Sequence, residues 1–179
     1  PLLSPYDYAA QNYTDRLLFP CAAHIFGTDN FGRDILTRIL VGGRYTLFIT
    51  FVCITMAALI GSALGLLAAF YPRLDNIVMR VVDIFMGIPT MLMCVSIVAA
   101  LGSSMENMMI ALIVTQSPEF ARIMRAQVLT LKDREYMEAA QSIGCSNLRV
   151  ILHHVVPNAL APVIVQYTLG AVSVILMSA

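Results

Sequence analysis

Long apolar stretches separated by short polar connections run through most of the chain. An α-helix needs about 20 apolar residues to cross the hydrocarbon core of a bilayer. The pattern predicts four such spans, at about residues 45–71, 78–101, 105–131 and 157–179. Residues 1–44 contain no span and are expected to form an external segment with a short amphipathic helix, so that residues 45–179 form the membrane domain.

Two of the predicted spans contain features of helix packing. Gly61 and Gly65 in the first span stand four residues apart, a spacing that allows two helices to approach closely. We expect this contact within the chain rather than in a dimer. In the second span, Gly87-Ile88-Pro89 predicts a kink, because proline cannot continue the helical hydrogen-bond ladder.

Composition places the chain among integral membrane proteins. Hydrophobic residues make up 59% of the sequence, charged residues 12%, and the mean hydropathy is +0.78. The formal net charge is +0, which argues against nucleic acid as a partner. Basic side chains cluster around the region between the last two spans: Arg122, Arg125, Lys132, Arg134 and Arg149. The positive-inside rule makes this side cytoplasmic.

A charged block separates the third span from the fourth. Good helix formers run from 133 to 142 with acidic residues in the first turn, and Gly144 then supplies a left-handed stop. Ser146 or Asn147 can cap a second short helix, and Pro157 suits the first turn of the last span. The sequence therefore predicts an all-α, polytopic transmembrane bundle with a cytoplasmic helix-turn-helix elbow.

The elbow, residues 132–156, carries a spaced motif that ends in the last span. Its members are Glu138, Ala139, Ala140, Gly144 and Pro157. This spacing resembles the coupling loop by which permease subunits of binding-protein-dependent ABC importers engage their ATPase. His154 stands where that pattern has an apolar residue. The resemblance implies that these five residues form the docking surface and hinge for the ATPase.

The N-terminal region carries a second resemblance. Its pattern is Gly-Thr-Asp-x-x-Gly-Arg-Asp, from Gly27 to Asp34, and Asp29 is placed to cap the helix that follows. The pattern is similar to the external segment of the dipeptide, oligopeptide and nickel branch of these permeases, in the second subunit of the pair. It lacks the Gly-Lys-Ser/Thr ending of a phosphate-binding loop.

The resemblance implies a set of partners and a larger protein. The partners are ABC ATPase subunits, a second homologous permease subunit and an extracytoplasmic solute-binding protein, in the lipid of a prokaryotic cytoplasmic (inner) membrane. The implied solute is a di- or oligopeptide, with nickel as another solute of the branch. The family has about six spans, so we expect this chain to be a fragment that lacks the first and last helices.

No catalytic group, cofactor site or metal site is expected from the sequence. It shows no Walker loop, and its cysteines are widely separated. Asp83, three residues after Arg80, forms either a structural pair with it or an intramembrane functional site. The alternative to an ATP-driven importer is a proton- or ion-coupled carrier that uses Asp83. An intramembrane enzyme would have only Asp83 with His153 or His154 as catalytic material.

Overall fold

The computed structural model describes residues 6–132, 134–135, 145 and 147–178, and it separates into two compact units, Pro1–Ile49 and Thr50–Ala179. The four coupling residues Glu138, Ala139, Ala140 and Gly144 lie outside the described residues. Each unit is therefore considered by itself.

The first unit is an irregular loop segment followed by the start of helix α1. It contains the short helix η1 (Tyr13–Asp15) and a single bridge between Thr28 and Asp34. Gly27 and Gly32 have φ angles of 74° and 70°, and a Cβ atom at either would lie within 2.3 Å of a backbone oxygen. Only glycine fits both requirements, which explains the two glycines of the N-terminal pattern.

Helix α1 is one continuous element, Ile35–Phe70. The sequence predicts a short amphipathic helix and a separate span from residue 45, but the structure contains no break between them. Asp34, not Asp29 as predicted, caps the helix: its Oδ2 accepts a hydrogen bond from the Thr37 backbone N–H at 2.7 Å. Glycines at 42 and 43 lie inside the helix, where each costs about 1 kcal/mol relative to alanine without breaking the helix.

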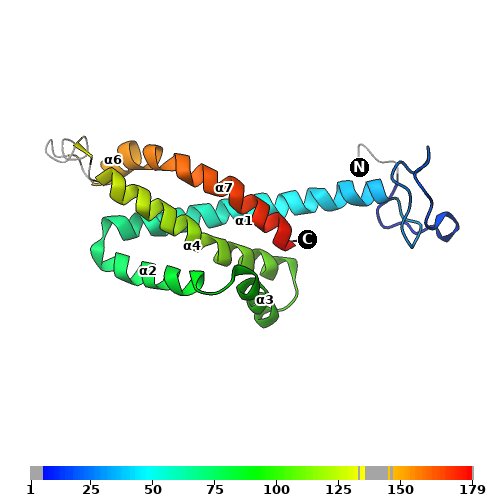
Figure 1. Ribbon diagram of the computed structural model, residues 1–179, viewed down its shortest axis with the longest axis horizontal. Helices are drawn as coiled ribbons and strands as arrows, with labels where there is room; N and C mark the ends of the chain where they lie inside the picture. The colour runs from blue at the N-terminus through cyan, green and yellow to red at the C-terminus, as the bar shows by residue number, and fades with distance from the viewer. Residues whose placement is uncertain (1–5, 133, 136–144, 146, 179) are drawn as a thin grey trace. The chain divides into compact units, whose positions relative to one another are not determined.

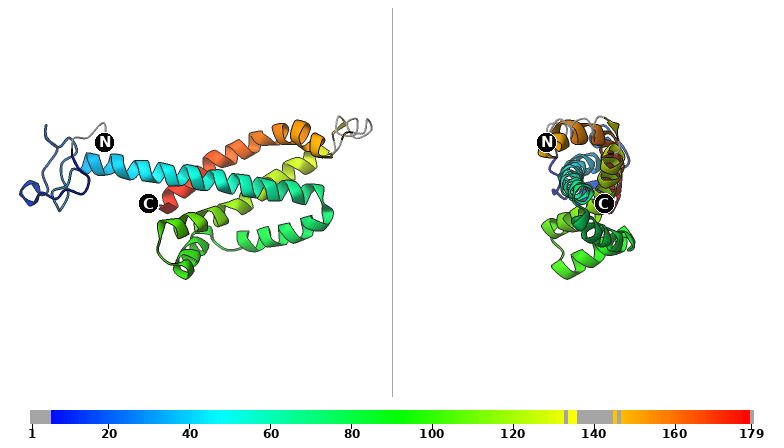
Figure 2. Two further views of the ribbon diagram at one scale, coloured as in Figure 1. Left: turned by 180° about the vertical axis from the view of Figure 1, so that it is seen from behind. Right: turned by 90° about the vertical axis from the view of Figure 1, so that its left-hand side faces the viewer.

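The second unit is a helical bundle built around α4 (Figures 1 and 2). Its other elements are the second part of α1, α2 (Pro72–Met86), α3 (Thr90–Leu101), α6 (Asn147–Val150), the π-helix η2 (Ile151–Val155) and α7 (Val156–Ser178). Helix α4 (Met105–Lys132) packs against α2, α3 and α7. The side chains of Leu112, Phe120 and Val128 on α4 are fully buried in this bundle.

The second predicted span is broken rather than kinked. Helices α2 and α3 meet at an angle of 94°, with Gly87 as the last-turn cap of α2 and Pro89 as the first cap of α3. Gly87 donates to Asp83 and Ile84, which closes α2, and Pro89 has no N–H with which to continue the helix. The pair forms either one broken span or a re-entrant element.

The glycine pair of α1 lies directly against α4, as predicted for a contact within the chain. A Cβ atom added to Gly61 would lie 2.3 Å from the Ser117 carbonyl oxygen, and one added to Gly65 would lie 2.2 Å from that of Ala121. The two backbones therefore approach closely, and small residues permit this approach.

Within the described residues, α1 and the helix His153–Ser178 are long and apolar enough to cross a membrane, and the bent pair α2–α3 adds a third candidate. Helix α4 has the length of a span, and it occupies the range expected for the third one. Its second half carries Glu119, Arg122 and Arg125, and polar contacts of these side chains organise the bundle.

Candidate coupling site

The described residues on either side of the elbow show how its two limbs are attached to the bundle. On the first limb, Lys132 ends α4. Its Nζ donates to the carbonyl oxygen of Ala69 at 2.6 Å and lies 4.7 Å from the ring centre of Phe70. Because Ala69 and Phe70 end α1, this lysine ties the start of the elbow to the end of the first helix of the bundle.

The second limb enters the bundle through a π-helix. Val150, the residue before η2, and Val155, the last residue of η2, are 1% and 0% exposed. Asn158, in the first turn of α7, donates from its side chain to the His154 carbonyl oxygen at 2.6 Å. Pro157 is exposed in the same first turn, the position predicted for it. Single π turns occur frequently at functional sites, and this one joins the elbow to α7.

Ion pairs hold α2 against α4. Arg125 contacts both carboxylate oxygens of Asp75, with Nη2 2.6 Å from Oδ2. Arg122 forms an ion pair with Asp83. The predicted pairing of Asp83 with Arg80 is therefore wrong: in the described chain, the partner of Asp83 comes from α4. A long Arg122 side chain reaches across to α2, whereas the sequence pattern considered only neighbours on one helix.

Side-chain contacts also join α7 to the rest of the bundle. Gln166 donates from Nε2 to the Glu119 carboxylate of α4. Tyr167 and Thr55 share a hydrogen bond of 2.9 Å between their hydroxyl groups, which joins α7 to α1. Both contacts are partly buried, and a buried polar group without a partner is costly.

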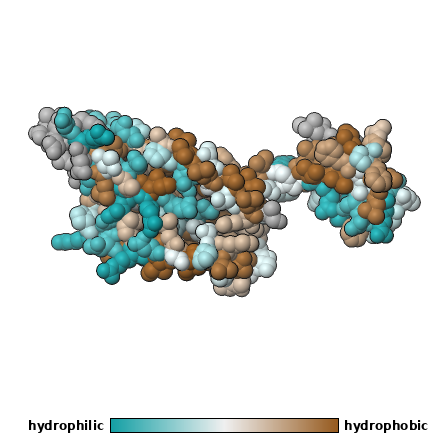
Figure 3. Space-filling view, in the orientation of Figure 1, coloured by the Kyte–Doolittle hydropathy of each residue, from teal (hydrophilic) through white to brown (hydrophobic). Residues whose placement is uncertain are grey.

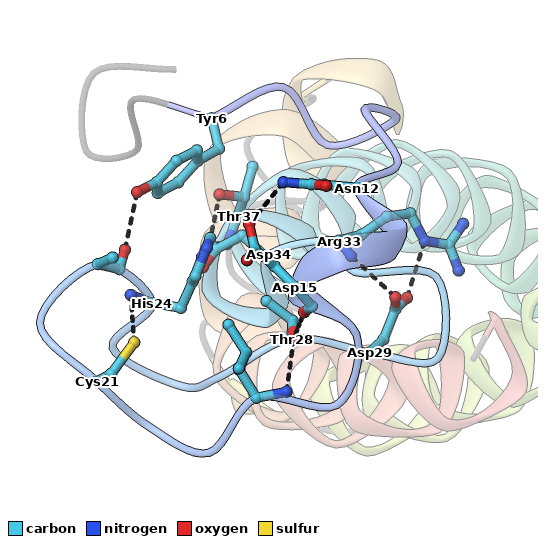
Figure 4. A network of polar contacts seen from close by, with 12 residues as sticks. Tyr6, Asn12, Asp15, Cys21, His24, Thr28, Asp29, Arg33, Asp34 and Thr37 are labelled. Atoms are coloured by element: carbon cyan, nitrogen blue, oxygen red, sulfur yellow. Dashed lines mark hydrogen bonds and ion pairs between the residues drawn. The ribbon is translucent and has the colours of Figure 1, made fainter.

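In the N-terminal unit, Asp29 closes the Gly-Thr-Asp loop (Figure 4). Its Oδ1 accepts from the backbone N–H groups of Phe31 (2.8 Å) and Arg33 (3.0 Å), and its Oδ2 contacts the Arg33 and Arg38 side chains at 2.8 and 2.5 Å. Burial alone would raise the pKa of this carboxyl, but the donors lower the pKa well below its ordinary value. Asp29 is thus an ionised group that stabilises the loop, and Asp34, directly before the start of α1, supplies the helix cap.

Asp34 and His24 form a second polar contact in this unit (Figure 4). The His24 Nδ1 lies 3.0 Å from Asp34 Oδ1, and both residues are buried. The Tyr6 ring lies 4.8 Å from the imidazole, centre to centre. Burial would raise the pKa of Asp34, but hydrogen bonds from Thr37 and His24 lower it below 3.8, its ordinary value.

The described residues contain no group of three His, Cys, Asp or Glu side chains placed to hold a metal ion. Cys21, Cys53, Cys94 and Cys145 are free thiols. His153 is exposed beside the half-buried His154 in η2, and Asp83 is on α2 with Arg122 as its partner. The structure does not assemble these residues into one catalytic group.

The interhelical contacts were not predicted from the sequence. Asp75 was visible only as a polar residue next to a span, and Gln166 as a polar residue inside one. Helical periodicity relates residues of one helix, whereas these partners are 47 and 50 residues away along the chain. The signal available was the presence of a charged or amide side chain in an apolar stretch.

Long apolar helices packed around α4 are typical of a multi-pass membrane protein. The chain belongs to the family of binding-protein-dependent transport system inner membrane components. The match to this family covers residues 61–179. It is therefore a component of the cytoplasmic (inner) membrane, of the kind found in ABC importers, as the sequence resemblance predicted.

Individual relatives agree with this assignment. The chain is 44% identical over 180 residues to a dipeptide transport system permease of Alkalihalophilus pseudofirmus, covering 100% of this chain and 59% of that protein. It is 40% identical to a probable D,D-dipeptide transport system permease of Escherichia coli strain K12, covering 100% and 60%. The chain thus spans about three fifths of the length of these relatives.

A solved structure shows the same fold. The chain superimposes on the MetNI methionine ABC transporter, in an inward-facing conformation, with a TM-score of 0.67. The match covers 78% of this chain and 71% of the other, at 22% sequence identity. At that identity the likeness establishes the helical arrangement alone.

Proposed function

We propose that this chain is part of a transmembrane subunit of an ATP-driven importer that moves di- or oligopeptides across the cytoplasmic membrane. The observation that carries the proposal is similarity, over the whole of this chain and about three fifths of the relatives, to permeases of dipeptide transport systems, at 44% and 40% identity. Glutathione, itself a small peptide, is the solute named for another relative, which is 37% identical over 93% of this chain. The subunit itself is non-catalytic, and ATP hydrolysis belongs to partner subunits.

The partners follow from the class of transporter. They are ABC ATPase subunits on the cytoplasmic side, a second homologous permease subunit and an extracytoplasmic solute-binding protein. Glu138, Ala139, Ala140 and Gly144 provide the docking surface and hinge for the ATPase, and Pro157 starts the helix that leads from the elbow. The small Ala139 and Ala140 side chains allow a close approach, and Glu138 offers a carboxylate to a basic partner.

The anchors on both sides of the elbow support a mechanical role for it. Lys132 binds the end of α1, and Val150 and Val155 are buried in the bundle at the other limb. An ATPase that displaces the elbow therefore pulls on α4 and on α7 together. Such a displacement tilts the attached helices and opens the path to alternate sides of the membrane.

The proposal is tested by co-purification and uptake with the full-length subunit. The native elbow should recover the ATPase from membranes, and Gly144→Arg should lose ATPase binding or ATP-driven uptake while the subunit still inserts. Glu138→Ala should weaken ATPase recovery. Cys145→Ser, next to the hinge, is the matched control and should retain both activities.

Two results of this experiment would contradict the proposed coupling role of the elbow. If the native subunit recovers no ATPase, or if Gly144→Arg imports peptides normally, the elbow is not the coupling element. The carrier alternative based on Asp83 is not favoured by the relatives. Asp83 also forms an ion pair with Arg122, so its carboxylate would have to leave that partner to bind a transported ion.

A further inference from the structure

A carboxylate stands at the middle of the central helix. Glu119 lies halfway along the 28-residue α4, and Thr115 and Arg122 share its face because they are four and three residues away. In Figure 3, hydrophilic side chains gather on the visible face of the second unit between hydrophobic surfaces. Glu119 is half-buried, so its carboxylate is held by the bundle and still reachable from outside it.

The partner of Glu119 is neutral. Gln166 of α7 donates to its Oε2 from the side-chain amide. The two nearby guanidinium groups are engaged elsewhere: Arg122 pairs with Asp83, and Arg125 pairs with Asp75. Among the ion pairs formed by the described residues, none includes Glu119. The position thus contains a carboxylate fixed by an amide, and no described residue forms an ion pair with it.

This arrangement is more than a structural contact requires. A neutral side chain at position 119 would accept the same hydrogen bond from Gln166 and would avoid the cost of a charge in an apolar bundle. Ionisable residues within membrane helices face the bundle interior or a water-filled cavity, usually pair with another group, and mark substrate and ion pathways. A cationic group of a solute would supply the opposite charge that no described residue gives to Glu119.

We propose that Glu119 faces the solute path and contacts positively charged groups of the transported solute. This inference rests on the proposed function, in which the solute is a peptide. The groups it would bind are ammonium groups, at a peptide N-terminus or on a lysine side chain. Gln166 is the positioning residue, since its amide fixes the carboxylate. A carboxylate there favours solutes of higher net positive charge, because unit charges about 4 Å apart interact strongly away from bulk water.

The test uses the complete importer in proteoliposomes, with both permeases, the ATPase and the binding protein. Uptake rates are measured for Lys-Ala, Ala-Ala and Glu-Ala at saturating binding protein loaded with each peptide. The binding protein is the same for every variant, so its own selectivity cancels when the ratio of the Lys-Ala rate to the Glu-Ala rate is compared between variants. ATPase activity stimulated by the loaded binding protein reports whether each variant assembles.

Glu119→Gln should lower the ratio of the Lys-Ala rate to the Glu-Ala rate by about fivefold or more and leave the stimulated ATPase activity in place. Gln166→Leu should lower the ratio by a smaller factor, because the carboxylate remains but is no longer fixed. Glu106→Gln is the matched control: it removes an exposed carboxylate from the first turn of the same helix and should leave the ratio unchanged.

Two results are decisive against the inference. If Glu119→Gln changes the uptake of all three peptides by one common factor, Glu119 acts structurally or in proton transfer and does not select solutes by their charge. If Glu106→Gln lowers the ratio as much as Glu119→Gln does, the effect belongs to the overall charge of the helix. A native complex that imports none of the three peptides would instead overturn the proposed function.

Discussion

Arg125 of α4 donates hydrogen bonds to both carboxylate oxygens of Asp75 on α2. The two side chains are 31% and 25% exposed, so bulk water screens this ion pair only partly. A two-pronged guanidinium–carboxylate contact also fixes the orientation of both groups. The first turn of α2 is thereby held against the second half of α4.

Asp75→Asn should therefore destabilise the second unit. One of the two charges is lost while Arg125 remains half-buried, and we expect a cost of about 1–3 kcal/mol. Thermal unfolding of the purified subunit in detergent measures the change. In the exchanged pair Asp75→Arg with Arg125→Asp, part of the loss should be recovered.

The Asp83–Arg122 pair is the natural comparison, because it joins the same two helices. Its side chains are 63% and 50% exposed, so Asp83→Asn should cost at most about 1 kcal/mol. Equal losses for Asp75→Asn and Asp83→Asn would show that burial of the pair does not control its contribution.

The glycines of α1 give a second prediction. Gly61→Ala and Gly65→Ala each place a Cβ atom within about 2.3 Å of a backbone oxygen of α4, and backbone cannot move aside cheaply. Each should destabilise the subunit by about 1–3 kcal/mol, the usual cost of overpacking. The same thermal unfolding experiment measures it.

Gly43→Ala is the control for this prediction. An added Cβ atom at Gly43 meets nothing within 4 Å, and alanine is a better helix former. The variant should be neutral or more stable by up to about 1 kcal/mol. A stabilising effect of Gly65→Ala would contradict the close packing of α1 on α4.

Much of the bundle was predictable because the length of an apolar stretch and the spacing of its small residues are properties of a single helix. The range of α4 and the packing role of Gly61 and Gly65 follow from such local patterns. The 94° break between α2 and α3 was underestimated as a kink, since proline signals an interruption but not its angle. The continuity of α1 was missed because Gly42, Gly43 and Arg44 interrupt the apolar pattern just before residue 45, whereas the helix continues through them.

The candidate site was less accessible to sequence analysis. The elbow motif gave the family and its coupling residues, which remain predictions because Glu138 to Gly144 lie outside the described residues. The partner of Asp83 was predicted on the same helix and proved to be Arg122. Pairs such as Glu119 with Gln166 depend on how helices that are far apart in the sequence pack together. A single sequence does not show which helices pack against each other.

Lys132 provides a prediction about coupling. Lys132→Met retains the apolar part of the side chain but removes the hydrogen bond to Ala69 at the end of α1. If the lysine transmits elbow movement, peptide uptake per ATP hydrolysed should fall several-fold while ATPase recovery stays normal. Lys132→Arg, which keeps a long cationic donor, should preserve more of the coupling. An unchanged ratio of uptake to hydrolysis in Lys132→Met would exclude this role.

Acidification should loosen the N-terminal unit. The folded pKa of Asp34 is below its ordinary value of 3.8, so its ionised form contributes stability that is present above pH 3.8 and is lost as the pH falls through the folded pKa. The amide signal of Thr37, measured by nuclear magnetic resonance from pH 6 to pH 2, should report this loss. Asp34→Asn should abolish the transition, whereas a transition that persists in this variant would assign it to another group.

The π-helix at Ile151–Val155 sets the rotation of everything that follows it. A π turn holds one more residue than an α turn, and one residue corresponds to about 100° around a helix axis. If the same five residues wound as a regular α-helix instead, they would turn α7 by roughly that angle, carrying Gln166 away from Glu119. The orientation of α7 about its own axis therefore depends on the winding of five residues within the elbow, and the contact between Gln166 and Glu119 depends on it in turn.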